Sequence, residues 1–593
     1  MEEFDILIEN AAIVEGTGGA EYKGSLGVIG DKIVDLGDVK GDAKKVIDAK
    51  GLTALPGFVD AHSHADMTFL WFPKCESYVM QGVTTIVGGM CGGSFAPIGE
   101  YLRLPRAITR DHLFSLDPYK YYPSKPYYHI EQVNEWMKEL YGWTIDWETM
   151  GGFFEKVETS GISMNYAPLV GHGNIRTCVM GLDYKRHATD DELNKMQVLI
   201  SEAMDDGCIG MSAGLDYDPD VFATQEEIIH GVKVLKEYNG IYHPHWRRTG
   251  RRRDVAAGHL PNEKISALME CVDVYKKTGV RLHIAHLSTG WNIYPEPSKE
   301  LDNANLKETI DMIAGESNGE LDITWDAIPY LVRGSRALGE AMPYLCAFLA
   351  PWLRELGSRE ALGKWLKVKD FREEIKEAVR QGRWFIRVAY NPNVNPKWAE
   401  NIIIVKSEVP HIEGKSIAEI AKQRDKDSWD TWFDLISEDP DTRSVTTGIH
   451  RWNNLYYTHP LGMVGLDTDV CDDNFQFNQP PWSVRGINTY SAYPLIFNKL
   501  VRDSNTLSLE EFVQKTSTMP ARVHNIRNRG TITEGSFADI VLLDVPNVEV
   551  LSTELEPRVY PEGIEYVITN GVVVKEKGQH TGAKPGRVLK RTD

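Results

Sequence analysis

The chain has 593 residues, of which 42% are hydrophobic and 25% are charged, as in an ordinary soluble globular protein. This length exceeds one small domain and suits a large catalytic domain with a smaller companion. The formal net charge of -20 argues against nucleic acid or an anionic membrane surface as a partner.

Both ends of the chain are rich in β-forming residues. The runs are Phe4–Ile8 and Ser25–Leu36 near the start, and Ala538–Asp544 and Tyr566–Val574 near the end. The dipeptide Asn570-Gly571, between two β-branched runs, predicts a type I′ hairpin. We therefore expect one small β-sandwich domain built from both termini, residues 1–54 and 530–593.

Between these ends, short apolar runs alternate with helical stretches. The eight runs are Leu55–Val59, Thr84–Gly89, Met164–Val170, Cys208–Ala213, Gly240–Tyr242, Val280–Ala285, Leu321–Trp325 and Met463–Leu466. Capping-box spacing predicts helix starts at Thr189, Thr224 and Ser508. This α/β pattern predicts a (β/α)8 TIM-like barrel over residues 55–529. The segments at about residues 98–150 and 331–460 are too long to be simple connections, so we expect them to be insertions.

Residue types that bind metals follow several of these runs. They are His62 and His64 after the first run, Cys91 after the second, His172 after the third, His245 after the fifth, His286 after the sixth, Asp326 after the seventh and Asp467 after the eighth. The carboxyl ends of barrel strands meet at one face. Side chains two apart in a strand point the same way, so His62 and His64 can bind one divalent ion, and a Cys91 thiolate would add a strong ligand.

The segments around these residues resemble the amidohydrolase superfamily and, within it, the D-aminoacylase (N-acyl-D-amino-acid deacylase) family. They include PGFVDAHSHAD, GVTTIVGGMCGGSFAP, NYAPLVGHGNIR, GMSAGLDYDP, IAHL, ADIVLLD, NGVVV and TGAKPGRVL. The resemblance covers almost the whole chain. It implies a zinc-dependent hydrolase that cleaves an amide bond of the N-acyl or aryl-amide type in a small molecule, one of the carbon-nitrogen bonds other than peptide bonds.

The resemblance also implies a role for each residue. Cys91, His245 and His286 are expected to form a tight zinc site, and His62 and His64 a second, weaker one. Asp467 would take a proton from metal-activated water and pass it to the leaving nitrogen. His172 would either polarise the substrate carbonyl or support the site through a hydrogen bond, and Asp66 and Asp326 are expected to be supporting residues or helix caps.

The substrate-binding elements depart from the family's pattern. Ser288 stands where the family usually has lysine, and the family's Tyr-Pro-Tyr-Thr-Ala-Ser is replaced by Ile328–Arg333. We expect Ser288, Tyr330 and Arg333 to contact the substrate, with little preference for N-acyl-D-amino acids.

Several alternatives stay open. They are a cyclic-amide hydrolase of the hydantoinase or lactam-opening type, a true N-acyl-D-amino-acid deacylase, and a catalytically silent metal-binding barrel. Retention of Asp467 argues against the last, because a protein that only binds metal has no use for a proton carrier.

Seven scattered cysteines and no CxxC pair suit reduced thiols in a cytoplasm better than a disulfide framework. The amino terminus has no secretory signal pattern, and no apolar stretch of the sequence is long enough to span a bilayer. We therefore expect a cytoplasmic enzyme with a small-molecule amide substrate and no nucleic-acid or membrane partner. The oligomeric state is left open, with a homo-oligomer among the alternatives.

Overall fold

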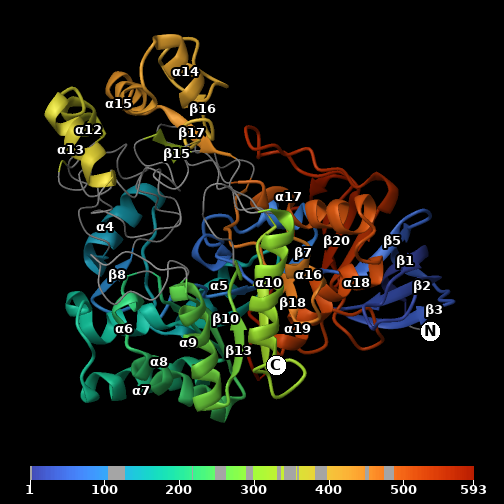
Figure 1. Ribbon diagram of the computed structural model, residues 1–593. Helices are drawn as coiled ribbons and strands as arrows, with labels where there is room; N and C mark the ends of the chain where they lie inside the picture. Colours follow the sequence, from blue (N-terminus) through green and yellow to red (C-terminus); the bar gives the residue numbers. More distant parts are fainter. Residues whose placement is uncertain are drawn as a thin grey trace.

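The computed structural model of the protein describes residues 3–103, 127–216, 218–247, 262–288, 298–329, 336–338, 356, 359–380, 397–447, 453–472 and 486–592. They form a barrel, a terminal sheet made from both ends of the chain, and two insertions (Figure 1). No described helix is both long and apolar enough to cross a membrane.

Eight parallel strands form the barrel, which confirms the predicted fold class. In order they are β6 (Phe58–Asp60), β7 (Val83–Gly88), β10 (Asn165–Gly171), β11 (Gly210–Gly214), β12 (Ile241–His245), β13 (Arg281–Ile284), β14 (Ile323–Ala327) and β18 (Gly462–Val464). Just beyond the carboxyl ends of β6 and β18, the Asp467 amide donates to the His62 carbonyl and the His64 amide to the Thr468 carbonyl, both at 2.8 Å. These bonds join the two edge strands and bring the metal-binding residues of both together.

The first predicted run belongs to two sheets rather than one. Residues 55–59 divide between β5 (Thr53–Pro56), which pairs with β19 of the terminal sheet, and β6 of the barrel. The chain changes sheets at Gly57, whose amide donates to the Asp539 carbonyl at 2.8 Å. A Cβ on Gly57 would lie 2.2 Å from Thr84 Oγ1, so only glycine fits at this crossing.

Helices cover the barrel and begin at several predicted positions. They are α1 (Glu76–Val79), α5 (Met150–Ser160), α6 (His172–Met180), α7 (Asp190–Asp206), α8 (Gln225–Val234), α9 (Asn262–Thr278), α10 (Lys299–Ala314), α16 (Leu455–Thr458), α17 (Asn488–Ile496), α18 (Leu509–Val513) and α19 (Met519–Val523). Short 3₁₀ or π segments are η1 (Ala65–Met67), η2 (Gly181–Asp183), η3 (Asp220–Phe222), η4 (Leu235–Tyr238), η7 (Phe497–Asp503), η8 (Gln514–Thr518) and η9 (Val545–Asn547).

Two of the three predicted capping boxes are complete. Those at Thr189 and Ser508 have both reciprocal hydrogen bonds. At Thr224 the hydroxyl accepts from the Glu227 amide, but the Glu227 carboxylate turns to Arg176 and contacts its Nη1 atom. The Glu227 carboxylate, which the local pattern predicts as part of the cap, therefore forms a buried ion pair instead.

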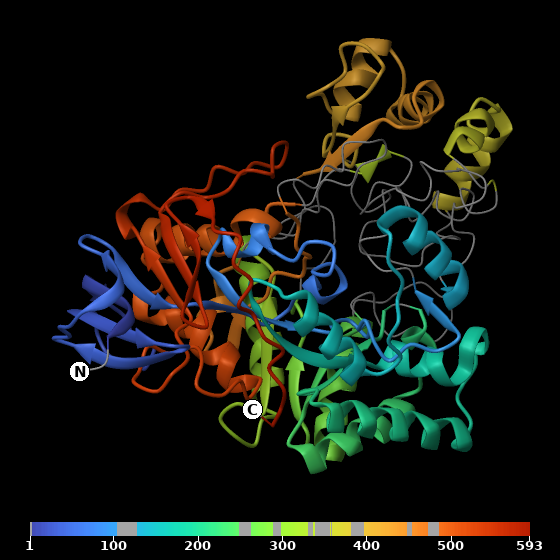
Figure 2. The same ribbon diagram turned by 180° about the vertical axis from the view of Figure 1, so that it is seen from behind.

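The terminal sheet combines both ends of the chain, as the blue and red strands of Figure 2 show. Its strands are β1 (Phe4–Ile13), β2 (Tyr22–Ile29), β3 (Lys32–Gly37), β4 (Ala43–Asp48), β5, β19 (Ile540–Leu543), β20 (Ile564–Thr569), β21 (Val572–Glu576) and β22 (Gln579–His580). Asn570 and Gly571 have φ of 49° and 74°, which confirms the predicted type I′ hairpin. The domain limits at residues 54 and 530 remain predictions.

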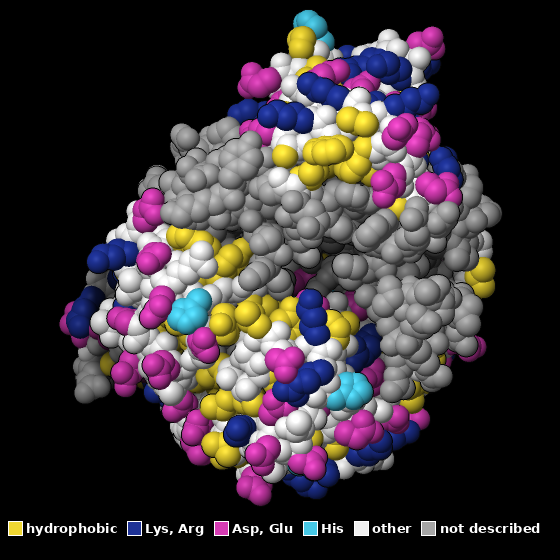
Figure 3. All heavy atoms as spheres, turned by 90° about the vertical axis from the view of Figure 1, so that its left-hand side faces the viewer, with side chains coloured by type: hydrophobic (Ala, Val, Ile, Leu, Met, Phe, Trp, Pro, Cys, Tyr) yellow, Lys and Arg dark blue, Asp and Glu magenta, His cyan; other side chains and the backbone are white. Residues whose placement is uncertain are grey.

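Both insertions leave the carboxyl ends of barrel strands, β7 and β14. The first contains β8 (Tyr101–Arg103), β9 (Tyr127–His129) and α4 (Ile130–Tyr141). The second contains β15 (Arg336–Ala337), α12 (Arg359–Trp365), α13 (Lys369–Arg380), β16 (Ile402–Lys406), α14 (Ile417–Arg424), α15 (Ser428–Glu438) and β17 (Arg443–Thr446). It has a hydrophobic core of its own around Trp432, and Figure 3 shows charged side chains of both signs on its surface at the top.

Candidate metal centre and active site

The structure brings six of the predicted site residues together at the carboxyl ends of the barrel strands. Their ligand atoms form two groups that share the Cys91 thiol, and within each group all atoms lie within 4.8 Å of one another. One group is His62, His64, Cys91 and Asp467, and the other is Cys91, His245 and His286. The shared sulfur makes this arrangement suited to one metal ion or to two adjacent ions.

Cys91 lies at the centre of the cluster. Its Sγ atom is 3.4 Å from His245 Nδ1, 3.5 Å from His62 Nε2 and 3.7 Å from His286 Nε2. Burial alone would raise the pKa of the thiol, but the charges of His245 and His62 and the hydrogen bonds of His245 and His286 lower that pKa well below its usual value. The surroundings therefore favour the thiolate, the form that binds metal.

Asp467 faces the imidazoles of the first strand. Its Oδ1 atom is 3.1 Å from His64 Nε2 and 3.6 Å from His62 Nε2. Burial would raise the pKa of this carboxyl, but the hydrogen bond from His64 and the charge of His62 hold the pKa well below its usual range. These surroundings favour the ionised carboxylate, which lies beside the metal-binding atoms.

Two other carboxylates contact the residues of this cluster or the loop that carries Cys91. Asp326 Oδ2 is 3.3 Å from His62 Nδ1, and its Oδ1 accepts from the His286 amide at 2.9 Å. Asp66 Oδ2 accepts from the Gly89 amide at 3.0 Å, two residues before Cys91. Such contacts orient ligands and their loops, which is the supporting role expected for both residues.

The backbone is strained at three members of the cluster. Cys91, His286 and Asp467 have φ of 55°, 33° and 48°, in the left-handed region that residues other than glycine seldom adopt. Such a conformation costs on the order of 1–3 kcal/mol at each position and persists where surrounding packing enforces it. It concentrates here at the residues predicted to bind metal or carry the proton.

His172 lies outside the two groups of metal-binding atoms that share Cys91. It is the first residue of α6, with Nδ1 2.9 Å from Asp220 Oδ1 and Nε2 3.5 Å from Glu227 Oε1. Burial lowers its pKa, but the neighbouring Asp220 carboxylate outweighs burial and raises it. Since both ring nitrogens face carboxylates, the supporting role fits this geometry better than polarisation of the substrate.

The predicted substrate-binding residues are only partly described. Ser288 is partly exposed and lies two residues beyond His286, whereas Tyr330 and Arg333 lie outside the described residues. Arg247, two residues beyond His245, is buried and donates to Glu270 Oε2 at 3.0 Å and to the Leu215 carbonyl at 2.8 Å. It is a structural residue.

A small cavity of about 60 Å³ opens beside Cys91. Its apolar wall is formed by Met67, Phe95, Pro97, Ile98, Leu102 and by the rings of Tyr101 and Tyr127. The only charged side chains among its described lining residues are Asp218 and Asp220. Sequence reasoning missed Asp220, and it indicated Glu227 only as a capping residue.

A parallel barrel with a cysteine, histidine and aspartate cluster at its carboxyl end defines a class of metal-dependent hydrolases. The amidohydrolase family matches residues 45–227 and 472–575. The chain belongs to the amidohydrolase family, and it is a hydrolase of carbon-nitrogen bonds other than peptide bonds.

Similar proteins match along the entire chain. D-aminoacylase of Alcaligenes xylosoxydans xylosoxydans is 25% identical over 600 residues, which cover 100% of this chain and 98% of that protein. N-acyl-D-aspartate deacylase of the same organism is 27% identical over 590 residues, which cover 99% of this chain and 95% of that protein.

Solved structures show the same fold. A D-aminoacylase crystal structure, described as defining a novel subset of amidohydrolases, has a TM-score of 0.67 at 24% identity and covers 99% of this chain and 100% of that chain. N-acyl-D-glutamate deacylase from Bordetella bronchiseptica, complexed with zinc and a phosphonate inhibitor, has a TM-score of 0.65 at 22% identity, with the same coverage.

Proposed function

We propose that this amidohydrolase uses zinc and Asp467 to hydrolyse the amide bond of a small molecule with an uncharged, apolar acyl or aryl group. One observation carries the proposal: a single cysteine, Cys91, is shared by two groups of metal-binding atoms, and one of these groups includes Asp467, whose surroundings favour the carboxylate. A barrel that only bound metal would not need that carboxylate.

The donor types fit zinc. Thiolate, imidazole and carboxylate are its usual ligands in proteins. We propose a tight site at Cys91, His245 and His286, and a weaker one at His62 and His64. Zinc bound there would lower the pKa of water to about 7 and polarise a carbonyl group.

Asp467 is placed to move the proton. Its carboxylate accepts a proton from the attacking water as the new C–O bond forms at the acyl carbon. It then donates that proton to the nitrogen as the C–N bond breaks, because an amide nitrogen must be protonated to leave. The contact with His64 at 3.1 Å and the bond from the Asp467 amide to the His62 carbonyl hold the carboxylate in place.

The cavity beside Cys91 supports an uncharged substrate group. A carboxylate buried without a partner costs several kcal/mol, and the described charges that line this cavity, Asp218 and Asp220, would repel it. Apolar contact with rings such as Phe95 instead contributes about 25 cal/mol per Å² buried. A second candidate, an N-acyl-D-amino acid, is favoured by the relatives named for that activity, which match the whole chain.

Substrate comparison tests the proposal. For the zinc-loaded enzyme we expect kcat/KM to be higher for an uncharged aromatic amide than for N-acetyl-D-methionine, and the Asp467→Asn variant to serve as the inactive control. A strong preference for N-acetyl-D-methionine would establish the second candidate. Faster turnover of a cyclic amide than of its open-chain analogue would identify a ring-opening enzyme and contradict both.

We also infer a cytoplasmic location. The six cysteines among the described residues are all free thiols, as expected in a reducing compartment; Cys346 lies outside the described residues. Detection of the enzyme in the cytosolic fraction of lysed cells would test this inference.

A further inference from the structure

A second cavity lies at the opposite end of the barrel from the metal-binding cluster. Its volume of about 580 Å³ is within the range of pockets that hold small molecules. Asn239, which precedes β12, and Leu321, which precedes β14, are parts of its wall. Since His245 ends β12 at the other side, the length of that strand, roughly 17 Å, separates this cavity from the cluster.

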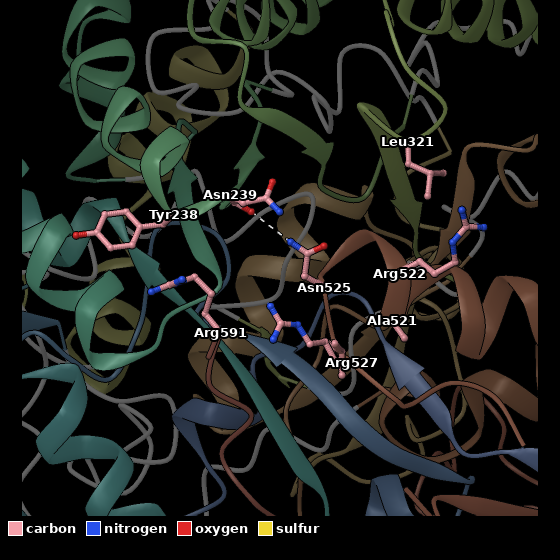
Figure 4. A pocket seen from close by; sticks show the side chains of 9 residues that line it. Tyr238, Asn239, Leu321, Ala521, Arg522, Asn525, Arg527 and Arg591 are labelled. Atoms are coloured by element: carbon pink, nitrogen blue, oxygen red, sulfur yellow. Dashed lines mark hydrogen bonds between the residues drawn. The ribbon is translucent and has the colours of Figure 1, made fainter. Parts of the chain in front are cut away.

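Positive charge gathers in this cavity, which we call the amino-end pocket. Its lining residues are Tyr238, Asn239, Leu321, Ala521, Arg522, Asn525, Ile526, Arg527 and Arg591. Figure 4 shows Arg591 beside Tyr238, Arg522 on the side of Leu321, and Arg527 between them. Three of these nine residues are arginines and none is acidic, although the whole chain carries a net charge of -20.

The contacts of two of these arginines, Arg522 and Arg591, leave their guanidinium groups available to a ligand. A different arginine, Arg281, donates hydrogen bonds to two backbone carbonyls at this end of the barrel, those of Val523 at 2.7 Å and Asn239 at 3.2 Å. Arg522 meets Glu320 at 3.5 Å, but both side chains are more than half exposed, so this ion pair is weak.

Arg591 is held at the edge of the pocket with donor capacity to spare. Its guanidinium carbon lies 5.0 Å from the centre of the Tyr238 ring, and its buried Nε atom has no hydrogen-bond partner in the described part of the chain. The stacked ring fixes the direction of the guanidinium group. The side-chain amide of Asn525 donates to the Asn239 carbonyl at 3.2 Å. This hydrogen bond joins two segments of the pocket wall.

We propose that the amino-end pocket binds a small organic anion that carries phosphate or carboxylate groups. Guanidinium groups form paired, charge-assisted hydrogen bonds with both chemistries, and the volume exceeds that of an inorganic ion. The walls come from η4, from α19 and the segment after it, and from the carboxyl-terminal tail. A bound anion would therefore join the tail to the barrel and stabilise the folded protein.

Binding of simple anions to the zinc-loaded protein tests this site. The probes are inorganic phosphate and succinate, measured by calorimetry and by thermal unfolding, with chloride at equal ionic strength as the baseline. We expect saturable binding of at least one probe and a rise in Tm. Saturation by phosphate alone would indicate phosphate esters as the ligand class, and saturation by succinate alone would indicate carboxylates.

Variants locate the site. Arg527→Gln and Arg591→Gln should each weaken binding by about tenfold. The control is Arg424→Gln, which should leave binding unchanged: Arg424 lies on α14 of the second insertion, pairs with Glu438 at 2.8 Å and does not line the pocket. The Cys91→Ala variant should still bind the anion. Equal affinity in wild type and both pocket variants, loss of binding in Cys91→Ala, or no saturable binding of either probe would overturn the proposal.

Discussion

Replacement of Asp467 by asparagine is the sharpest test of the proposed chemistry. The φ of Asp467 is 48°, a left-handed conformation that asparagine adopts more readily than most residues, whereas alanine would add about 1–2 kcal/mol of strain. The variant therefore keeps the loop and the 2.8 Å bond from the residue-467 amide to the His62 carbonyl. What it loses is the atom that accepts the proton.

The expected loss follows from this geometry. General acid and base catalysis by a positioned side chain contributes about 10²–10⁴ in rate, which corresponds to about 2.7–5.4 kcal/mol of activation free energy. The second group of metal-binding atoms, Cys91, His245 and His286, does not include Asp467. We therefore expect kcat to fall by about 10²–10⁴ while at least one tightly bound zinc remains per chain.

The assay combines kcat, elemental analysis and Tm on the same preparations. Asp472→Asn is the matched control, because Asp472 follows in the same segment and accepts from the Glu76 amide at 3.2 Å, away from the cluster. Its turnover should equal that of wild type. Unchanged turnover in Asp467→Asn with zinc retained would show that the proton carrier lies elsewhere, and Asp326 would be the next candidate.

Three further predictions concern the metal, a buried ion pair and pH. Cys91→Ala should lose most of its zinc in elemental analysis, since both groups share this sulfur; full occupancy would refute the ligand assignment. Glu227→Gln leaves Arg176 buried without its carboxylate and should lower the free energy of unfolding by about 3–5 kcal/mol, measured by urea denaturation with exposed Glu226→Gln as control. Burial raises the pKa of Asp472 to about 6 from 3.8, so its stabilising contribution is lost as pH rises through about 6. Between about pH 4 and 6, the Tm of wild type relative to that of Asp472→Asn should fall as pH rises, and parallel curves for the two proteins would contradict this.

Local features of the sequence predict much of the barrel and of the cluster. Parallel strands buried on both faces require continuous apolar runs, so all eight strands are visible as such runs. The alternation of side chains along a strand explains why His62 and His64 point to the same side. Asn570-Gly571 predicts its turn because few other dipeptides tolerate two positive φ angles.

Other features depend on residues that are distant in the sequence, and only the tertiary structure decides them. The run at residues 55–59 divides between two sheets because Gly57 crosses next to Thr84. Glu227 leaves its capping role because folding buries Arg176 beside it. An unpaired buried charge costs more free energy than the loss of one of the two hydrogen bonds of a capping box.

The strain at Cys91 and Asp467 and the amino-end pocket are equally invisible in the sequence. Left-handed φ angles at non-glycine residues arise where packing outweighs local preference. Arg527 and Arg591 are 64 positions apart in the numbering, and they meet in one pocket because the carboxyl-terminal tail returns to the amino end of the barrel. Local propensity determines which elements form, whereas the packing of distant segments determines which charges share a site.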